Sequence, residues 1–134
     1  MPKYLLDTNI CIYIMKRTPV EVVQRMDRCQ LGDVVMSSIT FAELEYGVLC
    51  ADDPAEAKEQ LDIMVKAAPV VPFDAAASTA YGPIRLATRE RKKDLMDKLI
   101  AAHAVALSVT VVTNNVSDFA SYPGVKVENW IAES

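Results

Sequence analysis

The sequence predicts an α/β fold built on a mostly parallel central sheet of about five strands. Short apolar runs of strand length alternate with longer helical runs along the whole chain. Strands separated in this way need crossover connections, which make neighbouring strands parallel. No internal repeat, low-complexity tract or Gly/Ser linker divides the 134 residues. We therefore expect a single domain over residues 1–134.

The N-terminal part of the chain is expected to form two strands and three helices. Residues 3–6 are a short apolar strand, and the helical run of residues 9–16 follows at once. A Thr-Pro pair, which is typical of a helix start, opens a second helix over residues 18–29. Residues 34–39 have the apolar character of a buried strand. A Thr-x-x-Glu pattern then opens the helix of residues 40–50.

The C-terminal part continues the alternation of helices and strands. An Asp-Pro-Ala-Glu pattern predicts a capped helix over residues 53–67, and residues 70–71 are a short third strand. A long helix over residues 74–92 is expected to kink at its internal Gly-Pro pair. Another helix covers residues 94–107. Two strands rich in β-branched residues complete the sheet, at residues 110–113 and 125–127.

The composition indicates a folded protein with free thiols. Apolar residues make up 51% of the chain, which is more than a disordered segment contains. No apolar run approaches the roughly 18 residues that span a bilayer, and no secretion signal is visible at the N-terminus. The three cysteines are odd in number and form no CxxC pair. We therefore expect a cytoplasmic protein without membrane contact.

The charge is unevenly distributed. A formal net charge of −4 disfavours a general nucleic-acid coat protein. Basic residues nevertheless gather before and within the helix of residues 94–107, at Arg85, Arg89, Arg91, Lys92, Lys93 and Lys98. A solvated helix face is the simpler explanation of each one. A phosphate-binding patch is the alternative, and it gains weight only if an anion-handling site lies nearby.

Two acids stand near the ends of predicted strands. Ligands of parallel α/β sheets bind beyond the carboxyl ends of the strands, and Asp7 lies at such an end. It could cap the helix that follows or bind a metal ion. Glu43 comes after the second strand, in the first turn of its helix. It could complete a capping box with Thr40 or face the same sheet edge as Asp7.

A third acid lies within the most apolar helix. The run LMDKLIAAHAVAL, residues 95–107, is apolar on nearly every side, so this helix should be largely buried. Helical spacing aligns Asp97 with the small residues Ala101 and Ala104, and a buried carboxylate there needs a partner or costs several kcal/mol. Lys98 points elsewhere. Asp94, one turn earlier, could simply cap the helix.

The single histidine and a fourth acid have simpler explanations. His103 lies about 120° around the helix from Asp97, so we expect a hydrogen-bonded core residue rather than a catalyst. Asp118 falls in the loop after the strand of residues 110–113. It is either an ordinary loop acid or a ligand. Asn114 and Asn115 beside it can orient carboxylates and water through their amides.

Taken together, the four acids predict a divalent-cation site. Carboxylates that converge raise one another's pKa and cannot all stay ionised unaided. Oxygen ligands select Mg²⁺ or Mn²⁺, whereas no thiol or imidazole stands at a spacing that suits zinc. A Mg²⁺ site of this kind keeps waters and completes its shell with phosphate oxygens of a substrate. Hydrolysis of a phosphodiester is therefore the chemistry that fits.

The sequence resembles the PIN-domain ribonucleases, specifically the VapC-type toxins of bacterial type II toxin–antitoxin pairs. Four motifs carry the resemblance across essentially the whole chain: LLDTNICIYIMK, SSITFAELEYG, LMDKLIAAHAVAL and VVTNNVSDFASYPGVKVENW. Each motif alone is moderately specific, but all four in this order are highly specific. The resemblance implies a PIN-like α/β/α sandwich.

The resemblance also implies roles for the acids. Asp7 and Asp97 would be the main Mg²⁺ ligands, and Glu43 would support the metal or position water. Many PIN domains have an Asp where Asn115 stands, so Asp118 would be the nearest replacement for the fourth catalytic acid. The residues that would orient these carboxylates are Thr8, Asn9, Thr113, Asn114 and Asn115.

Activity and partners follow from the resemblance as well. It implies a cytoplasmic endoribonuclease that blocks translation, often by cutting tRNA. It implies a toxin homodimer and a VapB-like antitoxin whose tail fills the active-site groove and whose DNA-binding part contacts the operator. Beside such a site, the basic run would hold single-stranded or looped RNA. The candidate contacts are Arg85, Arg89, Lys92 and Lys93.

Two alternatives stay open. A phosphatase that forms an aspartyl-phosphate also begins with a strand ending in Asp, but its general acid two residues later is Asn9 here. A non-catalytic metal-binding or partner-binding module is favoured by Asn115 in place of an acid. The absence of GxGxxG and P-loop motifs from the sequence disfavours nucleotide-cofactor enzymes.

Overall fold

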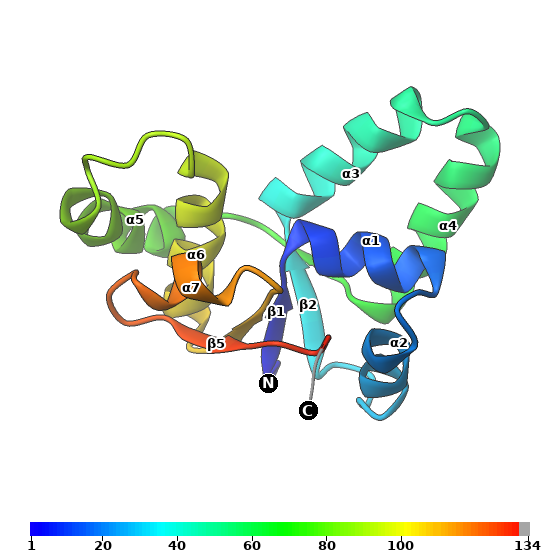
Figure 1. Ribbon diagram of the computed structural model, residues 1–134, viewed down its shortest axis with the longest axis horizontal. Helices are drawn as coiled ribbons and strands as arrows, with labels where there is room; N and C mark the ends of the chain where they lie inside the picture. Colours follow the sequence, from blue (N-terminus) through cyan, green and yellow to red (C-terminus); the bar gives the residue numbers. More distant parts are fainter. Residues whose placement is uncertain (132–134) are drawn as a thin grey trace.

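The computed structural model describes residues 1–131 and contains a five-stranded, all-parallel sheet with the order β3-β2-β1-β4-β5 (Figure 1). The strands are β1 (Tyr4–Leu6), β2 (Val34–Ser37), β3 (Val70–Val71), β4 (Thr110–Val112) and β5 (Lys126–Glu128). The predicted parallel sheet is confirmed. Leu5 pairs with Val35 on one side and with Val111 on the other, so β1 is the central strand.

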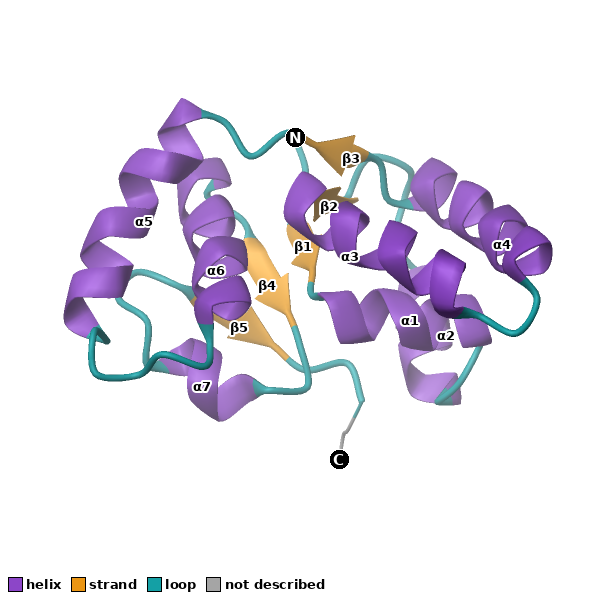
Figure 2. Ribbon diagram, turned by 90° about the horizontal axis from the view of Figure 1, so that it is seen from above, coloured by secondary structure: helices purple, strands orange, loops and turns teal. Residues whose placement is uncertain are grey.

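Helices cover both faces of the sheet, as Figure 2 shows. Within residues 1–131 they are α1 (Thr8–Lys16), α2 (Val20–Asp27), α3 (Ser38–Cys50), α4 (Pro54–Ala67), α5 (Ala75–Ala87), α6 (Leu95–Leu107) and α7 (Val116–Ala120). Helices α5, α6 and α7 gather on one side, and α1 to α4 on the other. The three-layer α/β/α arrangement is therefore confirmed. No helix in the described part of the chain is long and apolar enough to span a membrane.

Alternation along the strands divides the core into two clusters. Successive strand residues point to opposite faces of a sheet. One set of strand residues, Leu6, Met36 and Val112, packs with α1 to α4. The alternate set, Leu5, Val35 and Val111, packs with α5, α6 and Phe119 of α7. Both faces of the sheet are apolar. The strand sequences are therefore continuous apolar runs and do not alternate between apolar and polar residues.

Two helix starts differ from the expectation. Helix α3 begins at Ser38, because the Ser37 hydroxyl accepts a hydrogen bond from the Ile39 amide at 3.1 Å and so provides the N-terminal cap. The strand before it accordingly ends at residue 37, and Glu43 lies in the second turn. The capping-box explanation of Glu43 is therefore wrong. Helix α2 begins at Val20 rather than at residue 18, with Pro19 at its cap position and no side-chain cap.

The region after residue 87 also differs from the expectation. Helix α5 continues through Pro83 but ends at Ala87 rather than near residue 92, and Thr88 stands at its C-terminal cap. Residues 88–94 form a connection that leads into α6. Asp118 lies in the short helix α7 rather than in a loop. The carbonyl groups of Thr88 and Arg91, in the connection that follows α5, accept hydrogen bonds from the side chain of Lys98.

A truncation in the central strand should destabilise the fold strongly. Leu5 is fully buried between β2 and β4, so Leu5→Ala should lower the free energy of unfolding by about 2–5 kcal/mol through lost burial and a residual cavity. The control is Leu49→Ala at a position that is 76% exposed, where a change within about 0.5 kcal/mol is expected. Urea unfolding measures both, and equal effects would contradict the assignment of the core.

Candidate active site

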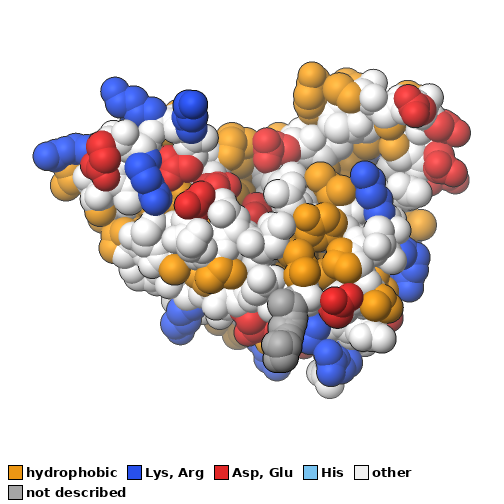
Figure 3. Space-filling view, in the orientation of Figure 1, with side chains coloured by type: hydrophobic (Ala, Val, Ile, Leu, Met, Phe, Trp, Pro, Cys, Tyr) orange, Lys and Arg blue, Asp and Glu red, His pale blue; other side chains and the backbone are white. Residues whose placement is uncertain are grey.

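A cavity of about 270 Å³ opens at the carboxyl edge of the sheet, and three of the four predicted acids line it. Asp7 follows β1, Glu43 projects from α3 and Asp97 from the first turn of α6. The other lining residues are Thr8, Asn9, Met96, Ile100 and Asn115. Acidic side chains gather in the hollow between the two halves of the molecule, as Figure 3 shows. The fold thus unites acids that are far apart in the sequence.

Asp7 both caps a helix and faces the cavity. Its Oδ1 accepts a hydrogen bond from the Thr8 amide at 2.7 Å, and its Oδ2 accepts one from the Thr113 hydroxyl at 2.8 Å. Burial raises the pKa of Asp7, the two hydrogen bonds oppose this change, and the nearby charge of Glu43 adds to it. The two explanations of Asp7 are therefore compatible, because one carboxylate caps α1 while standing at the edge of the sheet.

Thr8 connects the first two acids. Its amide binds Asp7, and its hydroxyl donates to the Glu43 carboxylate at 3.0 Å. The same hydroxyl lies 3.4 Å from the hydroxyl of Thr40, a buried residue in the first turn of α3. These contacts bind the beginning of α1 to α3 and set where the Glu43 carboxylate stands relative to Asp7.

Asp97 carries the most unfavourable negative charge in the cavity. Burial, followed by the charges of Asp7, Asp94 and Asp118, raises the pKa of Asp97 to about 6, and a hydrogen bond from Asn115 opposes this rise. Asn115 donates its side-chain N–H groups to Asp97 at 3.4 Å and to Asp118 at 3.0 Å. Asp118 therefore reaches the cavity through Asn115 and does not line it directly.

No basic side chain compensates the three cavity acids. Within residues 1–131, no Lys or Arg forms an ion pair with Asp7, Glu43 or Asp97. Asp94 is the contrast, since it pairs with Arg91 at 3.0 Å and with Lys98 at 3.3 Å. Burial raises the pKa of Asp94, but hydrogen bonds from Tyr122 and Lys98 and the two positive charges outweigh it and leave the pKa below its usual value. The cavity acids, unlike Asp94, have no positively charged partner within residues 1–131.

The donor set of the cavity suits a hard cation. Carboxylate, amide and hydroxyl oxygens surround the space, and no cysteine or histidine lines it. In the described residues, no three acidic, cysteine or histidine side chains stand close enough to form a complete cage. An ion here would have one or two carboxylate ligands and several waters, which is the coordination that Mg²⁺ prefers. The cavity thus fits a hydrated Mg²⁺ better than an ion with a full set of protein ligands.

The remaining polar residues named from the sequence differ in their contacts. Thr113 is buried, binds Asp7 and accepts a hydrogen bond from the Asn115 amide at 2.9 Å. Asn9 lines the cavity. Asn114 donates to the Tyr13 hydroxyl at 3.2 Å and does not line the cavity. The Thr113–Asn115 turn is therefore the part of the loop after β4 that contacts the acids.

His103 is a core residue, as expected. It is 1% exposed, its Nδ1 lies 2.8 Å from the Ser37 hydroxyl, and its ring packs edge-on against Phe73. Burial lowers the pKa of His103, although Asp74 opposes this change. The ring lies outside the lining of the acidic cavity. Its contacts join α6 to the end of β2.

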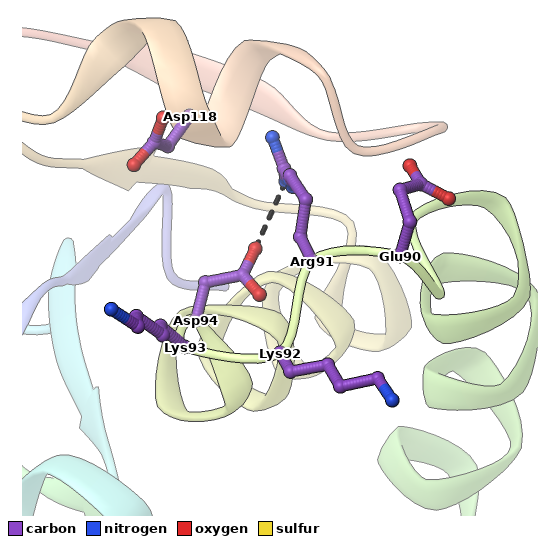
Figure 4. Close-up of a pocket in the computed structure, with 6 residues that line it drawn as sticks. All are labelled: Glu90, Arg91, Lys92, Lys93, Asp94 and Asp118. Atoms are coloured by element: carbon purple, nitrogen blue, oxygen red, sulfur yellow. Dashed lines mark ion pairs between the residues drawn. The ribbon is translucent and has the colours of Figure 1, made fainter.

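The residues of the predicted basic run lie in different surroundings. Lys92 and Lys93 line a second pocket of about 490 Å³, together with Glu90, Arg91, Asp94 and Asp118 (Figure 4). Arg85 stacks on Tyr81 of its own helix, and neither Arg85 nor Arg89 lines this pocket. Lys98 is only 1% exposed, so its inclusion in a surface run was wrong. Two lysines thus share a pocket with Asp118, which Asn115 connects to Asp97 of the acidic cavity.

Comparison with known proteins agrees with this architecture. The family model that describes the PIN domain matches residues 4–124. The chain is 37% identical over 132 residues to a tRNA(fMet)-specific endonuclease VapC of Shigella flexneri, covering 97% of this chain and 99% of the relative. It is 35% identical over 132 residues to Ribonuclease VapC2 of Rickettsia felis, covering 95% and 97%.

A solved structure supports the same grouping. The structure of DNA-bound VapBC from Salmonella typhimurium includes a chain that matches with a TM-score of 0.88 and 32% identity, over 97% of this chain and 99% of that one. The chain therefore belongs to the PIN-domain family, and its similarities place it among the VapC ribonucleases of that family.

The raised pKa of Asp97 predicts a pH-dependent stability. Folded Asp97 keeps its proton up to about pH 6, whereas the unfolded chain releases it near 3.8. Since the folded state then binds more protons, the Asp97 contribution to stability falls as pH rises through this window. Asp97→Asn removes the titration, so in EDTA the stability of the variant relative to the parent should increase from about pH 4 to about pH 7.

Thermal unfolding at several pH values measures this difference. Asp62→Asn serves as the control, because Asp62 is exposed on α4 and pairs only with Lys58. A difference in Tm between Asp97→Asn and the parent that stays constant with pH would contradict the electrostatic account of the cavity.

Proposed function

We propose that the protein is a Mg²⁺- or Mn²⁺-dependent endoribonuclease and the toxin of a type II toxin–antitoxin pair. The observation that carries this proposal is the cavity at the sheet edge, where Asp7, Glu43 and Asp97 meet without a basic partner. A phosphodiester substrate would bring further negative charge to this place. A bound cation would offset this negative charge, and metal-assisted phosphodiester hydrolysis uses that combination.

The side chains of the cavity would have different roles in the reaction. Asp7 and Asp97 would hold the metal, and Glu43 would support it or orient a water molecule. When bound, a divalent cation lowers the pKa of a coordinated water and stabilises the leaving oxygen. Thr113 and the Thr8 amide fix the Asp7 carboxylate through hydrogen bonds. The catalytic contribution of Asp118 would pass through Asn115, which binds it and Asp97 together.

The proposed substrate is RNA, and within RNA a tRNA. The Shigella relative is named for cleavage of a tRNA, and cleavage of tRNA would inhibit translation. Lys92 and Lys93 stand at the pocket beside the acids, where they could contact phosphates that flank the cleaved bond. Arg85 and Arg89, earlier on the same chain segment, would extend this contact along the RNA.

The proposed partner is a VapB-type antitoxin. The Salmonella neighbour is a VapBC complex bound to DNA, which supports an antitoxin partner. The tail of this antitoxin would fill the active-site groove, and its DNA-binding part would contact operator DNA. A pocket of about 350 Å³ between α1, α3 and α4 shares Thr8 and Glu43 with the acidic cavity, and Ile12, Met15 and Leu44 make its wall apolar. A toxin homodimer and a cytoplasmic location complete the proposal.

A non-catalytic binding module is the second candidate. Asn115 stands where an additional acid would strengthen a metal site, and the described residues contain no ready-made three-ligand cluster. In such a module the acids would hold an ion and a partner without cleaving RNA. The variants below separate the two candidates, because the module predicts no cleavage by the parent protein at any Mg²⁺ or Mn²⁺ concentration.

Loss of either main metal ligand should abolish cleavage. Asp7→Asn and Asp97→Asn should each lower the rate of RNA cleavage by at least about 100-fold, since even residues that only support ligands contribute 10- to 100-fold, and EDTA should stop the parent. Circular dichroism should show a retained fold. Asp62→Asn on the exposed face of α4 is the matched control. Cleavage by Asp97→Asn at the parental rate would show that the site is assigned wrongly.

His103 should affect stability more than activity. His103→Gln disturbs the buried hydrogen bond to Ser37 and the packing on Phe73, which should cost about 1–3 kcal/mol of unfolding free energy. The cleavage rate of the folded variant should stay near that of the parent, because the ring does not line the cavity. Urea unfolding and a cleavage assay test this pair of results, and a large loss of activity in a stable variant would contradict it.

A further inference from the structure

Lys98 is a buried charge that has no place in the chemistry proposed above. Its side chain is 1% exposed. The ammonium group donates to the Thr88 carbonyl at 2.9 Å and to the Arg91 carbonyl at 2.5 Å, and it lies 3.3 Å from Asp94 Oδ1. Two of its three N–H donors thus have carbonyl acceptors, and the nearby Asp94 carboxylate supplies the opposite charge. A buried ammonium with two carbonyl acceptors and a paired carboxylate is a specific structural link rather than an accidental burial.

The three groups that contact the ammonium lie along one short connection. Thr88 is the C-terminal cap of α5, and Asp94 is the N-terminal cap of α6. Lys98 therefore reaches back from the beginning of α6 to the end of α5, where the free carbonyl groups of a helix attract a cation. The 88–94 connection is bound to its ammonium at the start, in the middle and at the end.

A second set of contacts secures the same connection from the side of α7. The Tyr122 hydroxyl donates to Asp94 at 2.6 Å. The Arg91 guanidinium pairs with Asp94 at 3.0 Å and stacks on the Tyr122 ring at 4.9 Å. A dashed line in Figure 4 marks the ion pair between Arg91 and Asp94. The two residues on either side of Lys92 and Lys93 are thus both held in place.

Lys92 and Lys93 themselves are exposed and make no ion pair in the part of the chain that the structure describes. In Figure 4 they extend away from the Arg91–Asp94 pair. They share their pocket with Asp118, which Asn115 connects to Asp97. An exposed connection without such restraints would sample many conformations, and its lysines would have no defined position relative to the acids.

We propose that Lys98 is a positioning residue for RNA: it holds the 88–94 connection so that Lys92 and Lys93 meet substrate phosphates beside the acidic cavity. This inference rests on the function proposed above and adds to it how the phosphate contacts are placed. It predicts that Lys98, although it never touches RNA, contributes to RNA binding entirely through the two lysines.

A mutant cycle tests this dependence. Four proteins are compared, and all carry Asp97→Asn to prevent cleavage. The first has no other change, the second adds Lys98→Met, and the third adds Lys92→Ala/Lys93→Ala. The fourth, called the triple variant, adds Lys98→Met, Lys92→Ala and Lys93→Ala together. Fluorescence anisotropy with fluorescein-labelled tRNA in Mg²⁺ gives each Kd. Losing two phosphate contacts should weaken binding about 3- to 10-fold and reduce the salt slope of log Kd by about 1.4. Lys98→Met should produce nearly the same change.

The triple variant gives the decisive comparison. If Lys98 acts through the two lysines, adding Lys98→Met to Lys92→Ala/Lys93→Ala should not weaken binding further, because coupled residues are not additive. A further loss equal to that of Lys98→Met alone would overturn the proposal. Unchanged binding by Lys98→Met itself would overturn it equally.

Hydrogen exchange provides a readout that does not depend on RNA. The Arg91 amide donates to the Thr88 carbonyl at 2.9 Å, so amides of the 88–94 connection should lose protection in Lys98→Met and keep it in Lys92→Ala/Lys93→Ala. Unchanged protection in Lys98→Met would overturn the proposal. If the protein bound no tRNA at all, the proposed function would fail, while exchange would still show whether Lys98 holds the connection.

A second substitution covers the case in which Lys98→Met does not fold. Lys98→Gln is neutral and shorter, and it retains two N–H donors for the carbonyl acceptors. It should weaken tRNA binding in the same direction and by a smaller factor, with partial loss of protection in the 88–94 connection. If Lys98→Gln bound tRNA as tightly as the parent while the amides of residues 88–94 lost protection, the link between this connection and RNA binding would be contradicted.

Discussion

The repulsion between carboxylates at one edge of a parallel sheet is the constraint on which the site depends. Parallel strands end at the same edge, so residues that follow β1, β2 and β4 meet there although the sequence separates them widely. Asp7, Glu43 and Asp97 arrive without a basic partner, and burial makes their proximity costly. The fold holds this unfavourable arrangement by hydrogen bonds from Thr8, Thr113 and Asn115, which orient the carboxylates without neutralising them.

Helix α6 shows how selectively charge is distributed. Asp94 and Asp97 are one helical turn apart, yet Asp94 receives two cations and a phenol while Asp97 receives a single long hydrogen bond from an amide. The pKa values of the two carboxyl groups consequently change in opposite directions. Two acids of the same helix therefore have different surroundings: Asp94 is paired with the connection before α6, and Asp97 has no positively charged partner within residues 1–131.

Much of the architecture could be predicted from local patterns. Apolar runs and their alternation with helices predicted the sheet and its parallel strands, and an acid within an apolar helix indicated the site, because burial of an unpaired carboxylate has few explanations. The cap of α3 was misplaced because Ser37 and Thr40 are equally good caps by residue type, and only tertiary packing, which buries Thr40, decides between them.

The interactions of Lys98 and Asp118 could not be predicted in this way. A lysine beside other basic residues has the pattern of a solvated surface, and its burial depends on carbonyl groups that α5 exposes only because it ends at Ala87. Helix α7 is a single short turn of helix whose start lacks a side-chain cap. The bridge from Asp118 through Asn115 to Asp97 joins α7 to α6, and such a contact leaves no periodic signal in the sequence.

The most direct test of the account is the location of a bound metal ion in a crystal. An anomalous difference map from crystals soaked in Mn²⁺ should show one strong peak within coordination distance of the Asp7 and Asp97 carboxylates, with waters completing the shell. The same soak of Asp97→Asn crystals should leave this position empty. A peak elsewhere on the molecule, or full occupancy in the variant, would contradict the claim that these acids meet to hold a cation.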